Sequence, residues 1–325
     1  MKIFTNPNYD FVRWRWPAIA LSLVIILAGA ALIMNRGLQL GVDFEGGTVA
    51  VMRFEQTPDL GRIRQALAAS MPGGGDAVVS TYGPVENRDV MIRIRRTGDE
   101  TGGNLSKEVD AVVAALNKGN VGAFKTEKTE IVGPVVGEQL RRQGILATTL
   151  SLAGILIYIA IRFQLSFAMG AIAATLHDLL VCLAFLAFFR YDITLNVIAG
   201  LLTITGYSVN DTIVIFDRVR ENMRSMRRDN LSHIVNVAVN QTLSRTVITA
   251  GTTLLSVIAL YLFGGEVLKG FAFTMLVGII SGTYSTVLIA SSIAIMLQGR
   301  KPIKGQVAAT TPAPDTRKPG RRRAS

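Results

Sequence analysis

Six long apolar runs interrupt the mixed pattern of hydrophobic and polar positions along this chain. They cover residues 17–34, 144–161, 165–189, 193–216, 246–263 and 268–297. A helix of about 20 residues spans the ~30 Å hydrocarbon core of a bilayer. The pattern therefore predicts a polytopic α-helical membrane protein with six transmembrane helices, and it excludes a soluble single-domain enzyme. The last run is too long for one straight crossing, so we expect it to include an interfacial turn.

The stretch between the first two runs, residues 35–143, has a different pattern. Alternating apolar and polar positions predict strands, and helical spacing predicts helices, in the order βαββαβ. The strands are expected over 48–56, 77–82, 89–96 and 123–131, and the helices over 58–70 and 105–117. This order is typical of an α+β ferredoxin-like unit. We interpret the stretch as one folded interaction domain that Gly-rich joints, at 41–48 and 133–144, connect to the membrane helices.

Charge is distributed unevenly over the predicted loops. The chain has 34 Lys and Arg against 23 Asp and Glu, which gives a net charge of +11. Eighteen basic residues fall on the side that holds residues 1–16 and the tail 298–325, and two fall in the short loops opposite. Because basic loops stay in the cytoplasm, we predict cytoplasmic termini and a cytoplasmic face that suits anionic lipid. The tail is expected to be disordered, and no basic–aromatic module indicates nucleic-acid binding.

Residue types that form enzyme and metal sites are scarce. The chain has one Cys and two His, which excludes a disulfide framework and argues against a metal centre. No GxxxxGK[ST] loop is present to bind ATP. Asp192 and Asp211 would lie about 28 Å apart along a helix, too far to share the water of an intramembrane aspartyl protease. We therefore predict no enzyme, no cofactor and no metal.

Charged residues inside the apolar runs are the first candidates for function, because a charge in the bilayer core costs about 2.5–3.5 kcal/mol. Asp211 lies in the fourth run, and Arg245 stands just before the fifth. If these two helices are neighbours, the two side chains can form a pair. The pair is either a static ion pair that holds the helices together or a proton site at which Asp211 alternates between charged and neutral states.

Other polar residues also lie in the apolar runs. Thr203, Tyr207 and Asn210 belong to a set that recurs every three or four residues in the fourth run, which predicts one polar stripe facing other helices. His177 and Asp178 lie near the centre of the third run. Either a polar relay or a structural hydrogen bond between helices would explain this second pair.

Five motifs, in order along the chain, carry a resemblance to a known family. They are GVDFEGGT after the first run, GPVVGEQL before the second, LHDLL in the third, GYSVNDTIVIFDRVREN across the fourth and NQTLSRTVITAGTT into the fifth. Together they resemble the SecF branch of the SecD/SecF protein-export family, which is similar in architecture to half of an RND-like transporter. The resemblance implies that Asp211 and Arg245 are the proton-coupling carboxylate and its basic partner. It also implies that the joints contain family motif residues, namely Asp43, Gly46, Gly47, Thr48, Gly133, Pro134 and Gly137.

The resemblance further implies a function in the bacterial inner membrane. Such a subunit works with SecD and uses the proton-motive force to assist export of unfolded preproteins through SecYEG, after translocation driven by SecA. YajC and YidC are further partners that the resemblance suggests, and residues 35–143 would lie in the periplasm. The alternative is half of an RND-type proton-driven exporter of small molecules or lipids, although such pumps normally carry much larger outer domains.

Overall fold

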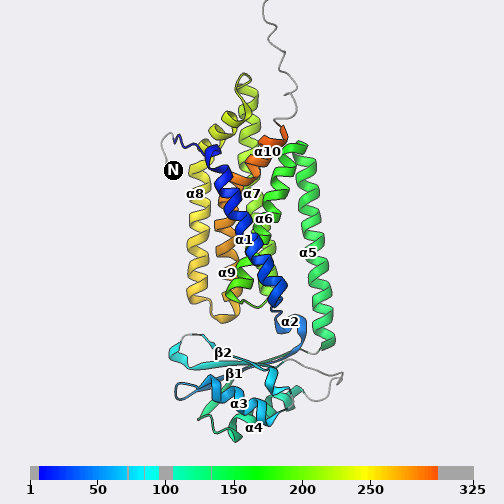
Figure 1. Cartoon of the computed structure of the whole chain (residues 1–325), viewed down its shortest axis with the longest axis vertical. Helices are drawn as coiled ribbons and strands as arrows, with labels where there is room; N and C mark the ends of the chain where they lie inside the picture. The colour runs from blue at the N-terminus through cyan, green and yellow to red at the C-terminus, as the bar shows by residue number, and fades with distance from the viewer. Residues whose placement is uncertain (1–6, 72, 84, 95–104, 133, 299–325) are drawn as a thin grey trace, which may run out of the picture.

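The protein consists of a long helical bundle with a small sheet domain at one end (Figure 1). The computed structural model describes residues 7–71, 73–83, 85–94, 105–132 and 134–298. The N-terminal segment and α10 lie at the end of the bundle opposite to the sheet domain (Figure 1). We call the two ends of the bundle the sheet end and the far end.

Within the described residues, six helices are long and apolar enough to cross a membrane. This confirms the predicted polytopic α-helical class. The six are α1 (Arg15–Arg36), α5 (Pro134–Arg162), α6 (Leu165–Phe189), α7 (Leu195–Ser225), α8 (Leu231–Phe263), and α9 (Glu266–Ser285) together with its continuation α10 (Ser291–Gln298). A 3-10 turn, Val12–Trp14, precedes α1.

Three of these helices form the centre of the bundle. About half of the residues in the most apolar stretches of α6, α7 and α9–α10 are buried, against roughly a tenth in α1, α5 and α8. Glycines allow the close approach of backbones that this packing needs. A Cβ at Gly278 of α9 would collide with Ile204 of α7, and a Cβ at Gly29 of α1 would collide with Ala184 of α6.

Several helix boundaries differ from those expected from hydropathy. The helix α5 begins at Pro134 rather than at residue 144, so the second Gly-rich stretch forms its first turns. At the far end, α7 continues to Ser225 and α8 begins at Leu231, well beyond the apolar runs. Hydropathy marks only the part of a helix that lies in lipid, whereas polar residues can continue the same helix into water.

The last crossing contains no interfacial turn, contrary to our expectation. The residues Thr286–Ala290 form a π-helical segment that joins α9 to α10 without a break in the helix. A π-helical segment absorbs an extra residue within a continuous helix, so a run longer than one ideal crossing can remain helical throughout.

The sheet domain has the predicted βαββαβ order. Its elements are β1 (Gly47–Phe54), α3 (Leu60–Ser70), β2 (Val78–Tyr82), β3 (Asp89–Ile94), α4 (Leu105–Lys118) and β4 (Phe124–Val132), with short 3-10 turns at Gly74–Asp76 and Val85–Asn87. The four strands are antiparallel in the order β2-β3-β1-β4, with Ala50 of β1 opposite Ile92 of β3 and Thr129 of β4. This is the ferredoxin-like arrangement.

One face of this sheet holds the core of the domain. Because side chains alternate between the two faces of a strand, Met52 and Ile92 point to one side, where they pack on Ile63 and Leu67 of α3 and on Leu116 of α4. Asp59 caps α3 by accepting hydrogen bonds from the backbone N–H groups of Gly61 and Arg62. Since both helices cover the same face, the other face of the sheet is left toward the helical bundle (Figure 1).

Candidate functional site

Asp211 is buried in the interior of the bundle, in the second half of α7. The Oγ1 hydroxyl of Thr246, on α8, donates a hydrogen bond of 3.2 Å to its Oδ1. The neighbouring residue Arg245 is largely exposed on the bundle surface. Within the described residues, no salt bridge joins Arg245 to Asp211. The structure thus places the two predicted residues on adjacent helices but puts Thr246 in direct contact.

Asp178 of α6 lies at the centre of a second polar cluster and is almost completely buried. Its Oδ2 accepts hydrogen bonds from Ser208 of α7 at 2.5 Å and from Ser285 of α9 at 2.9 Å. Its Oδ1 is 2.8 Å from the hydroxyl of Ser281 and 2.9 Å from Nδ1 of His177. A carboxylate has about four acceptor positions, so all of them are occupied when Asp178 is ionised.

His177 extends this cluster toward α1. Its Nε2 lies 3.1 Å from the hydroxyl of Tyr284, which is 3.1 Å from the hydroxyl of Ser22 on α1. If Nδ1 donates to Asp178, Nε2 is the acceptor for the Tyr284 hydroxyl, and Ser22 can donate to the Tyr284 oxygen. The chain of hydrogen bonds therefore links α6, α9 and α1.

The predicted polar stripe on α7 does not face the interior of this chain. Thr203 and Asn210 are exposed, Tyr207 is half-buried, and the Thr203 hydroxyl donates to the carbonyl of Ala199 on its own helix, at 2.7 Å. On α8, Arg245, Thr249 and Thr252 are exposed as well. Ser208 and Asp211, further round α7, are the buried polar residues of this helix that face the interior. That the stripe faces other helices therefore stays a prediction, and those helices would belong to a partner.

A backbone joint connects the start of α7 to the segment before the sheet domain. The N–H of Gly41 donates to the carbonyl of Ile193, and the N–H of Ile193 donates to the carbonyl of Gln39, each at 2.7 Å. Asp43, in the short helix α2 (Val42–Glu45), accepts a hydrogen bond of 2.9 Å from the N–H of Leu195, the first residue of α7. The motif aspartate thus satisfies one of the orphan donors at a helix N-terminus.

The motif glycines allow a tight turn beside α5. Gly46 and Gly47 have φ angles of 71° and 131°, which only glycine adopts readily. A Cβ on Gly137, in the first turns of α5, would lie 2.9 Å from the backbone nitrogen of Gly46. The next residue, Thr48, is buried and donates to Glu108. Pro134 is the first residue of α5, and Gly133 lies outside the described residues.

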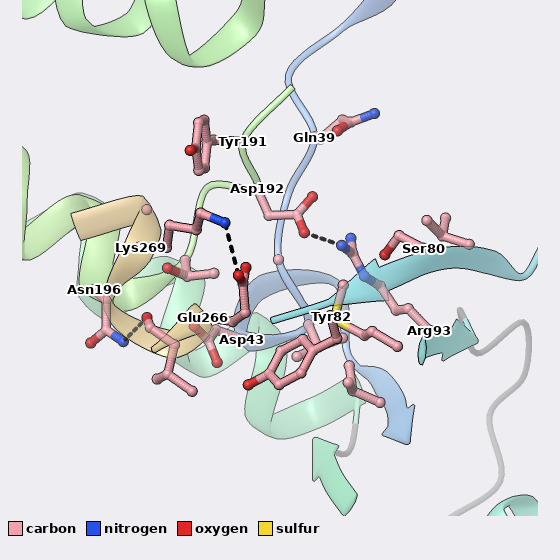
Figure 2. Close-up of a pocket in the computed structure, with 18 of the residues that line it drawn as sticks. Gln39, Asp43, Ser80, Tyr82, Arg93, Tyr191, Asp192, Asn196, Glu266 and Lys269 are labelled. Carbon is pink, nitrogen blue, oxygen red and sulfur yellow. Dashed lines mark hydrogen bonds and ion pairs between the residues drawn. The ribbon is translucent and has the colours of Figure 1, made fainter. Parts of the chain in front are cut away.

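An ion pair joins the sheet to the loop before α7. Arg93 of β3 is buried and binds Asp192, and it also donates to the carbonyl of Leu40 at 3.3 Å (Figure 2). Together with the backbone joint, this pair holds the sheet domain against the sheet end of α7. Sequence reasoning did not find Arg93, because nothing in a local pattern indicates a partner 99 residues away.

The described residues contain no group of three or more His, Cys, Asp or Glu side chains that could hold a metal ion. Sequence reasoning also missed Thr246 and the three serines around Asp178. The spacing of Ser281 and Ser285 was the available signal, since residues four apart lie on one face of a helix.

These features define a polytopic membrane protein with a buried acidic site and a small α+β domain at one end of its bundle. The family described as "Protein export membrane protein SecD/SecF, C-terminal" matches residues 112–300, and the "SecD/SecF GG Motif" matches residues 31–58. The chain belongs to the SecD/SecF family.

Relatives described as protein translocase subunit SecF share most of their length with this chain. The protein of Vibrio alginolyticus is 41% identical over 88% of this chain and 89% of its own length. The protein of Pseudomonas aeruginosa is 41% identical over 89% of this chain and 91% of its own length. That of Koribacter versatilis is 34% identical over 97% of this chain and 98% of its own length.

Two crystal structures of SecDF have the same fold. The translocon-associated SecDF of Thermus thermophilus superposes with a TM-score of 0.80 and 32% identity over 91% of this chain. A SecDF structure described as a super-membrane-facing form gives a TM-score of 0.66 at 31% identity. The chain spans 39% and 40% of the length of these two SecDF chains.

Proposed function

We propose that this chain is the SecF subunit of a Sec protein translocase. In the proposed mechanism, it works with SecD and uses the proton-motive force to assist export of preproteins through SecYEG after SecA-driven translocation. The family membership and the names of the relatives support the role in protein export. Asp211 is the proposed site of proton binding, and Arg245 and Thr246 are its proposed partners.

The observation that carries the mechanism is the difference between the two buried carboxylates. Within the described residues, Asp178 has four hydrogen-bonding partners, three of them serine hydroxyls that donate to its carboxylate. Among the residues that the structure describes, Asp211 accepts one side-chain hydrogen bond, from a neutral hydroxyl. A buried carboxylate with few donors is stabilised poorly as an ion and is neutralised at low cost. A small movement of Arg245 toward or away from Asp211 would therefore shift the balance between its charged and neutral states.

The exposed polar stripe supports a partner inside the membrane. Thr203, Asn210 and Arg245 lie in spanning helices and are exposed on the surface of this chain. Polar side chains at this depth are costly in contact with lipid, and they normally face other helices or a water-filled cavity. A second bundle that packs on α7 and α8 would cover them, and the SecDF structures make SecD the proposed occupant.

Export of a secretory precursor in cells depleted of the native protein tests this function. We expect Asp211→Asn to accumulate precursor in a pulse-chase experiment as the depleted strain does, because the amide cannot bind and release a proton. Asp217→Asn is the matched control: it is the same substitution on α7, but Asp217 forms a partly exposed ion pair with Arg162.

Both variants must be present in the membrane at the level of the wild type. Normal export by Asp211→Asn would contradict the proton-coupling role. Normal export together with a loss of small-molecule efflux from vesicles would instead favour the RND-type exporter.

A further inference from the structure

A cleft of about 820 Å³ separates the open face of the sheet from the sheet end of the bundle (Figure 2). All four strands contribute to one wall. The other wall is formed by the segment before α2, the loop between α6 and α7, and the first turns of α7 and α9. The volume falls in the range of small-ligand sites, about 300–1,000 Å³.

The wall formed by the sheet is mainly apolar, with polar groups between. Val49 and Val51 of β1, Val78 of β2 and Met91 of β3 supply apolar surface, and Ser80 of β2 adds a hydroxyl group. These residues alternate with those that fill the core beneath the sheet. Since α3 and α4 cover only the core face, this second apolar face has no helix of the domain packed on it.

The opposite wall has a similar mixture. Leu195 and Val267 supply apolar surface, and Asn196 donates to the carbonyl of Val267 at 3.2 Å, which leaves its amide oxygen as an acceptor. Tyr191 adds a phenol whose pKa is raised by burial and by a hydrogen bond to Tyr261, so its hydroxyl stays neutral.

The charges that line the cleft nearly balance. Four basic residues (Arg93, Lys128, Arg190 and Lys269) stand against three acidic ones (Asp43, Asp192 and Glu266). Arg93 is bound to Asp192, and Lys269 donates to Glu266 at 2.8 Å (Figure 2). Two of the four cations are thus neutralised by carboxylates, which leaves less positive charge than a phosphate or nucleotide normally binds, and the described lining contains no cluster that could hold a metal ion. The chemistry suits a ligand that is nearly neutral and carries both apolar and amide groups.

The dimensions suit a short length of extended chain. Neighbouring strands lie about 4.8 Å apart, so three spacings across the four strands span roughly 14 Å. An extended polypeptide rises about 3.3 Å per residue and covers this distance with about four residues. The walls of the cleft alternate apolar patches with paired charges, so they can accept side chains of different character from a bound polypeptide. The backbone amides of that polypeptide can form hydrogen bonds with Ser80, Asn196 and Gln39.

We propose that this cleft holds about four residues of an extended, unfolded polypeptide in transit. The inference rests on the proposed export function and names the surface of this chain that contacts the preprotein. It places the contact between the sheet and the sheet end of α7, the helix that also carries Asp211.

Site-specific photo-crosslinking in membranes tests the proposal. A photo-reactive amino acid is placed at Ser80 or Met91 in the full chain within its native complex, and a radiolabelled precursor is stalled during export. The control position is Gln65, an exposed residue of α3 on the other side of the sheet. We expect a precursor crosslink from both cleft positions and none from Gln65. Equal crosslinking from Gln65, no precursor crosslink, or crosslinks only to another membrane subunit would overturn the proposal.

A second variant separates this inference from the proposed function. Ser80→Trp places a bulky ring in the cleft, and we expect it to slow precursor release several-fold, whereas Gln65→Trp should leave the rate unchanged. If Ser80→Trp exports at the wild-type rate, the cleft is not the contact site. If Met91 crosslinks to the precursor while Asp211→Asn exports normally, the cleft is the contact site and the proton-coupling role of Asp211 is rejected. If Asp211→Asn loses export and no cleft position crosslinks, proton coupling is supported and the cleft is rejected as the contact site.

Discussion

Asp178 and Asp211 lie on neighbouring helices, and their surroundings assign them different roles. The hydroxyls of Ser208, Ser281 and Ser285 all donate to Asp178, so this carboxylate connects α6, α7 and α9. In the described part of the chain, Asp211 has one hydroxyl partner, Thr246. At the scale of the residue, we therefore interpret Asp178 as a structural centre and Asp211 as the group that can change its charge.

The variants Asp178→Asn and Asp211→Asn should separate these roles in a measurement of stability. An amide nitrogen cannot accept hydrogen bonds, so Asp178→Asn loses about two of the four. Interhelical hydrogen bonds in membranes contribute about 0.6 kcal/mol each on average, and we expect a loss of about 1 kcal/mol. Thermal unfolding of the purified protein in detergent should show a lower midpoint for Asp178→Asn and little change for Asp211→Asn. An unchanged midpoint for Asp178→Asn would contradict its structural role.

At the scale of the element, α7 links the buried acidic site to the sheet domain. The helix is continuous from Leu195 to Ser225, and Asp211 lies about 24 Å from its first residue at 1.5 Å per residue. Its start is fastened by the joint with Gln39 and Gly41, by Asp43, and by the pair of Asp192 with Arg93. A shift of α7 along its axis would consequently move the sheet.

Charge reversal at Arg93 and Asp192 tests this connection. Arg93→Asp places two acids together and leaves a buried charge unpaired, which costs up to about 3–5 kcal/mol when both groups are deeply buried; Asp192 is partly exposed, so we expect a smaller loss. Hydrogen exchange should increase at residues 39–43 and 190–195. The double variant Arg93→Asp with Asp192→Arg should restore much of the protection.

Arg218→Ala is the control for this measurement, because its ion pair with Glu221 is exposed and such pairs contribute little. If the double variant exchanges as fast as Arg93→Asp alone, the ion pair does not fasten the two parts.

At the scale of the whole molecule, the six crossings place the N-terminal segment and α10 at the far end, away from the sheet domain (Figure 1). The basic residues of the loop between α7 and α8 lie at that same end. The positive-inside tendency therefore predicts that the far end faces the cytoplasm and that the sheet domain, with its cleft, lies on the opposite side of the membrane.

Labelling of single cysteines with a membrane-impermeant reagent checks this orientation. In a Cys182→Ser background, Asp229→Cys in the loop between α7 and α8 should react only from the cytoplasmic side. Asp59→Cys, at the start of α3, should react only from the opposite side. If both positions react from the same side, the two ends of the bundle do not lie on opposite sides of the membrane, and the predicted arrangement is wrong.

The sequence by itself determined the six membrane helices and the βαββαβ order, and it singled out Asp211 as a candidate. The length of an apolar run, the alternation of apolar and polar residues and helical spacing are local properties of the sequence. A charged residue within an apolar run can likewise be recognised without knowledge of the tertiary structure. The five motifs likewise identified the family, because they are read from consecutive residues.

Only the tertiary structure decided which side chains meet. Consecutive helical residues point about 100° apart, so a small rotation of α8 determines that Thr246, and not Arg245, contacts Asp211. The polar stripe on α7 was evident from its spacing, but spacing does not tell which neighbour a stripe faces, and Thr203 and Asn210 face out of this chain. The pairing of Arg93 with Asp192 and the cleft beside it join segments far apart in sequence, and only the packing of the sheet against the bundle brings them together.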